Sequence, residues 1–203
     1  MTLGPQTRLP SASTVAILIA PAMVACAILL SGCIPLVIGG VAATASIATD
    51  RRSAGAQLDD ELIEDKSSAE ILDRFKGRDV HVNVTSYNGN VLLTGEVPGD
   101  AIKSEIGEIA RRMAKTRSVQ NELIVGAATN LGSRSNDTLI TSKVKARFVE
   151  ANRFQINHVK VVTERGIVYL LGIVRPDEGN AAAEIARTTS GVQRVVKVFE
   201  YLN

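Results

Sequence analysis

Tryptophan is absent from this 203-residue sequence, and its other aromatic residues are only four Phe and three Tyr. Proteins that bind single-stranded nucleic acids or sugars usually stack them on aromatic side chains, and such platforms are scarce here. A large excess of positive or negative charge is also lacking, because 23 basic and 21 acidic side chains leave a net charge of +2. Nucleic-acid-binding domains are usually strongly basic. Composition therefore predicts no nucleic-acid partner.

Charged residues are almost missing from the first 49 positions, where Arg8 is the single one. Residues 15–30 are nearly all apolar, and Leu-Ser-Gly-Cys follows at 30–33. A weakly basic start, an apolar stretch and small residues are typical of a secretory signal. An uncleaved membrane anchor is the alternative, since 13–49 hold enough apolar length to span a bilayer. Prolines and a Gly-Gly pair interrupt that length, which favours the signal.

The Leu-Ser-Gly-Cys motif resembles the lipobox of bacterial lipoproteins. The resemblance implies cleavage before Cys33, lipidation of Cys33, and therefore a signal peptide over 1–32 and a lipidated tether over 33–57. Ile34 follows the cysteine in place of Asp, which by the same resemblance implies delivery to the outer membrane. The mature chain would then have no free cysteine. Cys26 would be removed with the signal peptide, so no thiol would remain for a disulfide or a metal.

The rest of the sequence repeats itself at an offset of 77 residues. The segment VNVTSYNGNVLLTGEV (82–97) aligns with VKVVTERGIVYLLGIV (159–174), and valines, leucines and glycines coincide. Small and polar residues at 128–135 are typical of a linker. The repeat therefore predicts two domains, 58–127 and 136–203.

Each copy shows the same succession of local patterns. Valines that alternate with polar residues indicate a half-buried strand. The pairs Asn88-Gly89 and Arg165-Gly166 predict tight hairpin turns, and Gly95 and Gly172 indicate a bend or a close backbone approach. The leading helices are expected at about 59–76 and 137–151. The last strands are expected at about 119–125 and 192–202. We predict an α+β fold with the order α-β-β-α-β in each repeat, a three-stranded mixed sheet and two helices packed on one face.

The V-x-L-x-G ends of the returning strands make each repeat resemble the BON domain. The whole chain resembles the dual-BON-domain outer-membrane lipoprotein family, most closely at ATDRRSAGAQLDD (48–60), NGNVLLTG (88–95) and NDTLITSKV (136–144). The resemblance implies a lipid-anchored outer-membrane protein that faces the periplasm and is not an enzyme. It also implies binding to anionic phospholipid such as phosphatidylglycerol and support of outer-membrane integrity.

The two leading helices differ in charge. Residues 59–76 hold seven acidic and three basic side chains, whereas 137–153 hold two acidic and four basic ones. Basic residues near an anionic membrane surface contribute about 1 kcal/mol each to binding. Only the second helix is therefore expected to contact anionic headgroups, and the resemblance implies a lipid contact through the same helix.

A helical wheel of the second leading helix places Ile140, Val144 and Phe148 on one stripe, which should face the core. Small and apolar residues lie opposite, between basic ones, a pattern that suits shallow insertion below phosphates. The predicted contact residues are Leu139, Ser142, Lys143, Lys145, Ala146, Arg147 and Val149. Alternatively, Leu139 and Val149 pack against the other repeat, because a lone repeat of ~65 residues rarely has a sufficient core.

No arrangement of residues points to catalysis. His81 and His158 are equivalent but lie in different repeats and alternate with the expected core valines, so we assign them no role. We expect no catalytic residue, metal, cofactor or small-molecule substrate. The acidic cluster at 59–65 suits a solvated helix N-terminus. It also suits a docking face, so an envelope scaffold that binds a protein partner through the acidic first repeat stays open as the alternative function.

Overall fold

The structure is a computed structural model, and it describes residues 50–202. The predicted signal peptide, Cys33 and most of the predicted tether lie outside the described residues. The first repeat consists of α3 (Ala54–Arg74), β1 (His81–Tyr87), β2 (Asn90–Val97), α4 (Asp100–Arg112), β3 (Ser118–Asn121) and β4 (Ile124–Val125). The second consists of α5 (Leu131–Ala151), the 3-10 turn η1 (Ile156–His158), β5 (Val159–Glu164), β6 (Ile167–Val174), α6 (Pro176–Arg187) and β7 (Arg194–Tyr201).

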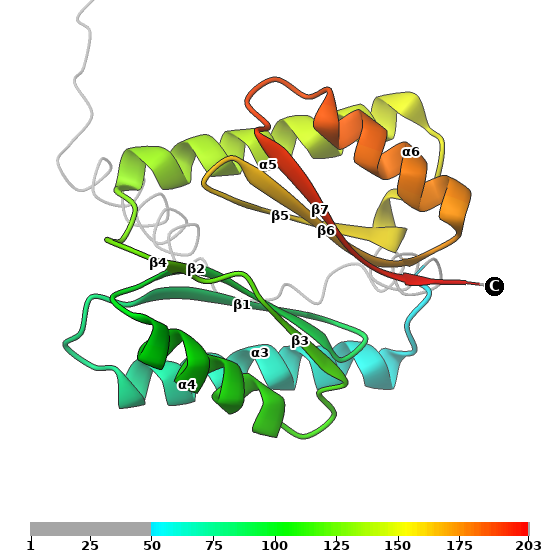
Figure 1. The fold of residues 1–203 in the computed structure, drawn as a ribbon. Helices are drawn as coiled ribbons and strands as arrows, with labels where there is room; N and C mark the ends of the chain where they lie inside the picture. Colours follow the sequence, from blue (N-terminus) through cyan, green and yellow to red (C-terminus); the bar gives the residue numbers. More distant parts are fainter. Residues whose placement is uncertain (1–49, 203) are drawn as a thin grey trace, which may run out of the picture. The chain divides into compact units, whose positions relative to one another are not determined.

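Both sheets are mixed. The strands of each hairpin, β1–β2 and β5–β6, run antiparallel, and the last strand of each repeat runs parallel to β2 or β6. Two helices cover one face of each sheet (Figure 1). The predicted α+β class and the α-β-β-α-β order are confirmed. One detail differs, because the last strand of the first repeat is interrupted between β3 and β4.

The hairpin turns have the predicted geometry. Asn88 and Gly89 have φ angles of 53° and 74°, and Arg165 and Gly166 have 52° and 73°. Two successive positive φ angles match the twist of a tight two-residue hairpin. Glycine adopts this conformation without steric cost, which explains its presence at the second position of both turns.

Gly95 and Gly172 lie where the neighbouring strand approaches closely. A Cβ atom at either position would lie 2.1 Å from a carbonyl oxygen, that of His81 or that of His158. Gly95 also has a φ of +117°, whereas Gly172 has no positive φ. The close approach is therefore common to both repeats, and the unusual backbone angle belongs to the first repeat alone.

Both leading helices begin earlier than the sequence predicted. α3 begins at Ala54, after Ser53, whose hydroxyl accepts a hydrogen bond from the Ala56 amide. α5 begins at Leu131, after Asn130, whose side chain accepts from the Ser133 amide. Ser and Asn are favoured N-cap residues. Here they lie in the polar stretches that we interpreted as tether and linker.

Two arginines before α3 are held by ion pairs and lie in the predicted tether. Arg51 donates to the two carboxylate oxygens of Glu178 at 2.6 and 2.9 Å. Arg52 donates to Asp60 at 2.9 Å, and its guanidinium carbon lies 4.0 Å from the centroid of the Tyr87 ring. The chain before α3 is thus fixed to the second repeat by Arg51 and to the first repeat by Arg52.

Each repeat has its own core between its sheet and its helices. Large side chains of both cores, such as Leu93 and Ile106 in the first and Phe148 and Leu170 in the second, are at most 1% exposed. A third buried cluster joins the repeats. It consists of Tyr87 and Leu92 from the first repeat and Tyr169, Leu171 and Ile173 from the second.

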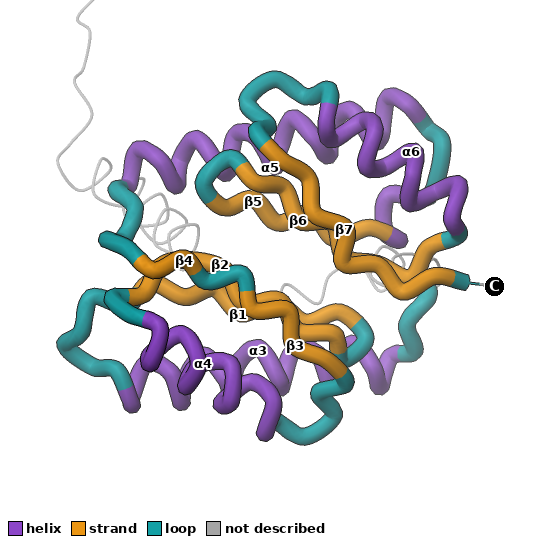
Figure 2. The backbone as a smooth tube through the Cα atoms, viewed as in Figure 1, coloured by secondary structure: helices purple, strands orange, loops and turns teal. Residues whose placement is uncertain are grey.

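The third cluster buries the sheet faces that carry no helices. Figure 2 shows the two sheets between the two pairs of helices. Seven of the eight residues are buried in β2 and likewise in β6, because both faces of these strands are covered. The sequence predicted docking between repeats but did not predict this surface.

Candidate membrane-contact site

Helix α5 has one buried and one exposed face. Ile140, Val144 and Phe148 are at most 1% exposed and pack in the core of the second repeat. Leu139 and Val149 are 59% and 64% exposed. The alternative that these two residues pack against the first repeat is therefore wrong, because the repeats meet through their sheets.

Most of the predicted contact residues share the exposed face. At about 100° per residue, the small and apolar members fall within an arc of about 80°, and one lysine lies on either side of that arc. We call this surface the α5 outer face, and its exposed members are Leu139, Ser142, Lys143, Lys145, Ala146 and Val149. An apolar centre between two ammonium groups suits contact with an anionic surface.

Arg147 differs from the other predicted contact residues. Its Nη1 donates to the Ile185 carbonyl at 2.9 Å and to the hydroxyl groups of Thr188 and Thr189 at 3.1 and 2.9 Å. The guanidinium is half-buried and satisfies acceptors at the end of α6. Arg147 therefore joins α5 to α6, and we leave it out of the α5 outer face.

The acidic cluster at the start of α3 is not simply solvated, as the sequence suggested. Asp60 is 2% exposed and accepts hydrogen bonds from the Ser86 hydroxyl and from the amides of Asn88 and Gly89, at 2.6 to 2.8 Å. Burial by itself would raise the pKa of Asp60, but hydrogen bonds from Ser86 and from the turn amides outweigh burial and lower it. This carboxylate anchors the β1–β2 turn on α3.

The second repeat contains the same anchor 77 residues later. Asp137 is 5% exposed and accepts from the amides of Arg165 and Gly166, both at 2.8 Å. Asp60 and Asp137 coincide in the alignment of the repeats, so this equivalence was a signal in the sequence that we did not use. Both carboxylates support the fold and are not available to a partner.

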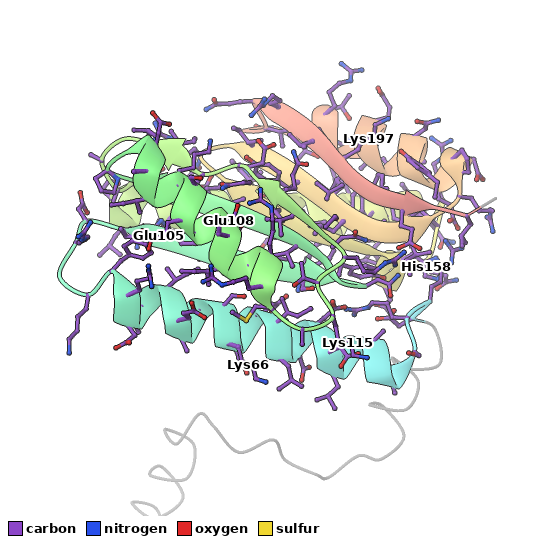
Figure 3. All side chains as sticks on the ribbon, turned by 60° about the horizontal axis from the view of Figure 1, so that its bottom comes forward. Lys66, Glu105, Glu108, Lys115, His158 and Lys197 are labelled. Atoms are coloured by element: carbon purple, nitrogen blue, oxygen red, sulfur yellow. The ribbon has the colours of Figure 1, made fainter. Side chains whose placement is uncertain are left out.

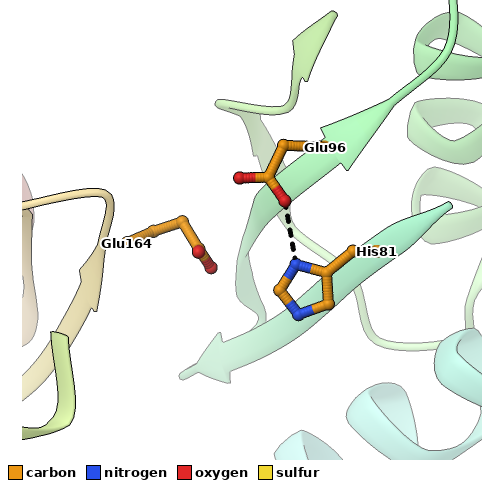
Figure 4. Close-up of side chains that lie close together, drawn as sticks. All are labelled: His81, Glu96 and Glu164. Carbon is orange, nitrogen blue, oxygen red and sulfur yellow. Dashed lines mark hydrogen bonds and ion pairs between the residues drawn. The ribbon is translucent and has the colours of Figure 1, made fainter. Parts of the chain in front are cut away.

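The equivalent histidines lie apart and have different neighbours. His81 Nδ1 lies 3.0 Å from Glu96 Oε2, its cross-strand partner, and Glu164 of the second repeat lies close to both (Figure 4). His158 is 8% exposed, and its Nδ1 lies 3.8 Å from Glu178. Burial raises the pKa of Glu164, and the charges of Glu96 and Asp137 raise it further. His81 thus lies on the face of its sheet that meets the second repeat, whereas His158 ends η1 and lies beside Glu178 of α6.

Comparison with known proteins identifies the family. Residues 59–127 and 136–203 match the model of the BON domain. The chain belongs to the BON-domain family, and the resemblance inferred from its sequence is confirmed.

Several named proteins are similar to it over most of their length. The Outer membrane lipoprotein DolP of Haemophilus influenzae is 41% identical over 87% of this chain and 92% of that protein. The 21 kDa hemolysin of Actinobacillus pleuropneumoniae is 34% identical over 75% of this chain and 79% of that protein. The Osmotically-inducible protein Y of Escherichia coli is 29% identical over 70% of this chain and 72% of that protein.

The part of the chain that the structure describes contains no helix with the length and apolarity needed to cross a bilayer.

Proposed function

We propose that this protein is an outer-membrane lipoprotein, anchored through Cys33 and facing the periplasm, that binds anionic phospholipid through the α5 outer face and supports the integrity of the outer membrane. The exposure of Leu139 and Val149 between Lys143 and Lys145 carries the proposal. The name of the Haemophilus influenzae relative and the lipobox-like motif at 30–33 support the anchor.

Two free-energy terms contribute to such binding. Burial of a leucine side chain in an apolar environment is worth about 1.5–3 kcal/mol. Each lysine near an anionic surface adds about 1 kcal/mol, so Lys143 and Lys145 together account for about thirtyfold in affinity. The charge term is screened over about 8 Å at physiological salt. Binding should therefore weaken as salt rises without disappearing.

A sedimentation assay with phosphatidylglycerol and phosphatidylcholine vesicles tests the proposal. The soluble chain should begin at or before Asp50, because Arg51 and Arg52 are part of the fold. The double change Lys143→Glu and Lys145→Glu should remove the preference for phosphatidylglycerol. Leu139→Glu should weaken binding to both lipids.

Leu72→Glu is the matched control, since Leu72 is a 75% exposed leucine on α3 of the first repeat. It should bind vesicles as the wild type does. Val144→Glu places a charge in the core and should unfold the second repeat. It therefore shows how loss of folding changes vesicle binding. If Leu139→Glu remains folded by circular dichroism and binds both lipids as well as the control does, the α5 outer face is not the lipid site.

The alternative is a scaffold that docks a protein partner through the acidic first repeat. Three leucines of α3 favour it, because Leu58, Leu62 and Leu72 are 57%, 43% and 75% exposed. The acidic charge is partly neutralised, however. Glu105 and Glu108, labelled on α4 in Figure 3, pair with Arg74 and Arg111. If the folded wild type does not bind vesicles in the sedimentation assay, the scaffold becomes the favoured function.

A further inference from the structure

Three side chains that could bind a metal meet at the contact between the repeats. His81 comes from β1, Glu96 from β2 and Glu164 from the end of β5, and one ligand atom of each lies within 4.8 Å of the others. His81 and Glu96 face each other across the hairpin because they are cross-strand partners. Figure 4 shows the carboxylate of Glu164 turned toward this pair.

The cluster is buried and is short of hydrogen-bond donors. Glu96 is fully buried and Glu164 is 5% exposed. Oε2 of Glu96 receives its contacts from His81 and Thr129, and Oε2 of Glu164 accepts from Asn83 at 2.9 Å. Among the described residues, Oε1 of Glu96 has no hydrogen-bond partner, and in Figure 4 it points to the side on which Glu164 lies. Buried carboxylate oxygens normally have a partner.

Within residues 50–202, one guanidinium group pairs with the free oxygen of Glu96, and its contact is loose. The guanidinium of Arg165 lies 3.7 Å from Glu96 Oε1, beyond hydrogen-bond distance, and its side chain is 42% exposed. Two buried carboxylates that face one imidazole are electrostatically costly without a closer positive charge. A divalent cation between them would supply that charge and occupy the free oxygen.

We propose that His81, Glu96 and Glu164 bind a divalent transition-metal ion that bridges the two repeats. One imidazole nitrogen and two carboxylate oxygens form a donor set that Zn²⁺ accepts. Ligand atoms of tetrahedral zinc lie about 3.4 Å apart. His81 and Glu96 are already that close, at 3.0 Å, whereas a pair at the 4.8 Å limit of the cluster must approach by about 1.4 Å. A cleft of about 240 Å³, lined in part by His81, Asn83 and Glu164, adjoins the cluster and has room for water as a further ligand.

The site should occur once in the described repeats, because the second repeat keeps the histidine, as His158, but lacks the glutamate that corresponds to Glu96. Ile173 stands 77 residues after Glu96, and it packs in the apolar cluster between the sheets. A metal that binds the folded state alone stabilises it by mass action. Because two ligands come from one repeat and one from the other, the metal would oppose separation of the repeats.

The test uses the full-length protein in detergent, freed of metal with EDTA and then titrated with ZnCl₂ by isothermal calorimetry. The wild type should bind about one Zn²⁺ per chain, and Zn²⁺ should raise its Tm. His81→Ala and Glu164→Gln should each weaken this binding at least tenfold, because changing even a residue that only supports a ligand typically costs about ten- to hundredfold. Glu164→Gln keeps the side-chain shape and an oxygen that can accept from Asn83.

Glu64→Gln is the matched control. Glu64 also forms an ion pair between the repeats, with Lys160 at 2.8 Å, but it lies outside the cluster. This variant should bind Zn²⁺ with the affinity of the wild type. The proposal is overturned if the wild type shows no saturable binding, or if either His81→Ala or Glu164→Gln, folded by near-UV circular dichroism, binds as tightly as Glu64→Gln does.

Discussion

Replacement of Gly95 and Gly172 by alanine separates a steric effect from backbone strain. At both positions the new methyl group would lie 2.1 Å from a carbonyl oxygen of the neighbouring strand, so the strands of the hairpin must move apart. Overpacking of this kind costs about 1–3 kcal/mol. Gly95 alone has a φ of +117°, and an alanine held there costs about 1–3 kcal/mol more. The expected loss of stability is about 1–3 kcal/mol for Gly172→Ala and about 2–6 kcal/mol for Gly95→Ala.

Urea unfolding of the soluble chain, followed by far-UV circular dichroism, measures both losses. Gly126→Ala is the matched control, because a Cβ there meets no atom within 4 Å and φ is not positive. It should change stability by less than about 1 kcal/mol. Equal losses for Gly95→Ala and Gly172→Ala would refute the contribution of φ. A loss no larger than that of Gly126→Ala would refute the steric argument.

Two further predictions concern the anchor and the response to acid. Cys33→Ala should block lipid attachment and cleavage, and a lipidated mature chain in its intact mass spectrum would contradict the assignment of Cys33. Hydrogen bonds from Arg51 lower the pKa of Glu178 to about 2 from 4.5. Because the folded pKa lies below the unfolded one, this stabilisation is complete above about pH 4.5 and is lost as the pH falls toward 2. Between pH 7 and pH 2 the wild type should lose up to about 3 kcal/mol more than Glu178→Gln in urea unfolding, and equal losses would show that the ion pair adds nothing.

The order of elements could be predicted because local signals specify it. Asn88 and Gly89 favour one turn conformation wherever they occur, and alternating valines favour a strand. The exposed face of α5 could be predicted for the same reason, since the 3.6-residue period separates Leu139 from Val144. These signals depend on neighbours in the sequence, and the structure confirms the elements that they predict.

The contacts between the repeats could not be predicted, because no local pattern encodes them. Thr94 and Glu96 alternate with buried residues of β2, which is typical of a solvent-facing sheet surface, yet both are at most 1% exposed. Glu164 reaches His81 only because the second sheet packs on the first. Glu96 and Glu164 follow His81 by 15 and 83 residues, and such separations in the sequence do not indicate a shared site.

The apolar contact between the sheets limits how the protein can be dissected. A chain cut at the linker and reduced to its second repeat would uncover Tyr169, Leu171 and Ile173, together with Val162, Val196 and Val198, which pack around them. Uncovered apolar surface of this kind adheres to membranes and to other copies of itself. Vesicle binding by such a fragment would thus be an artefact of truncation, and the intact pair of repeats is the smallest unit in which lipid specificity has meaning.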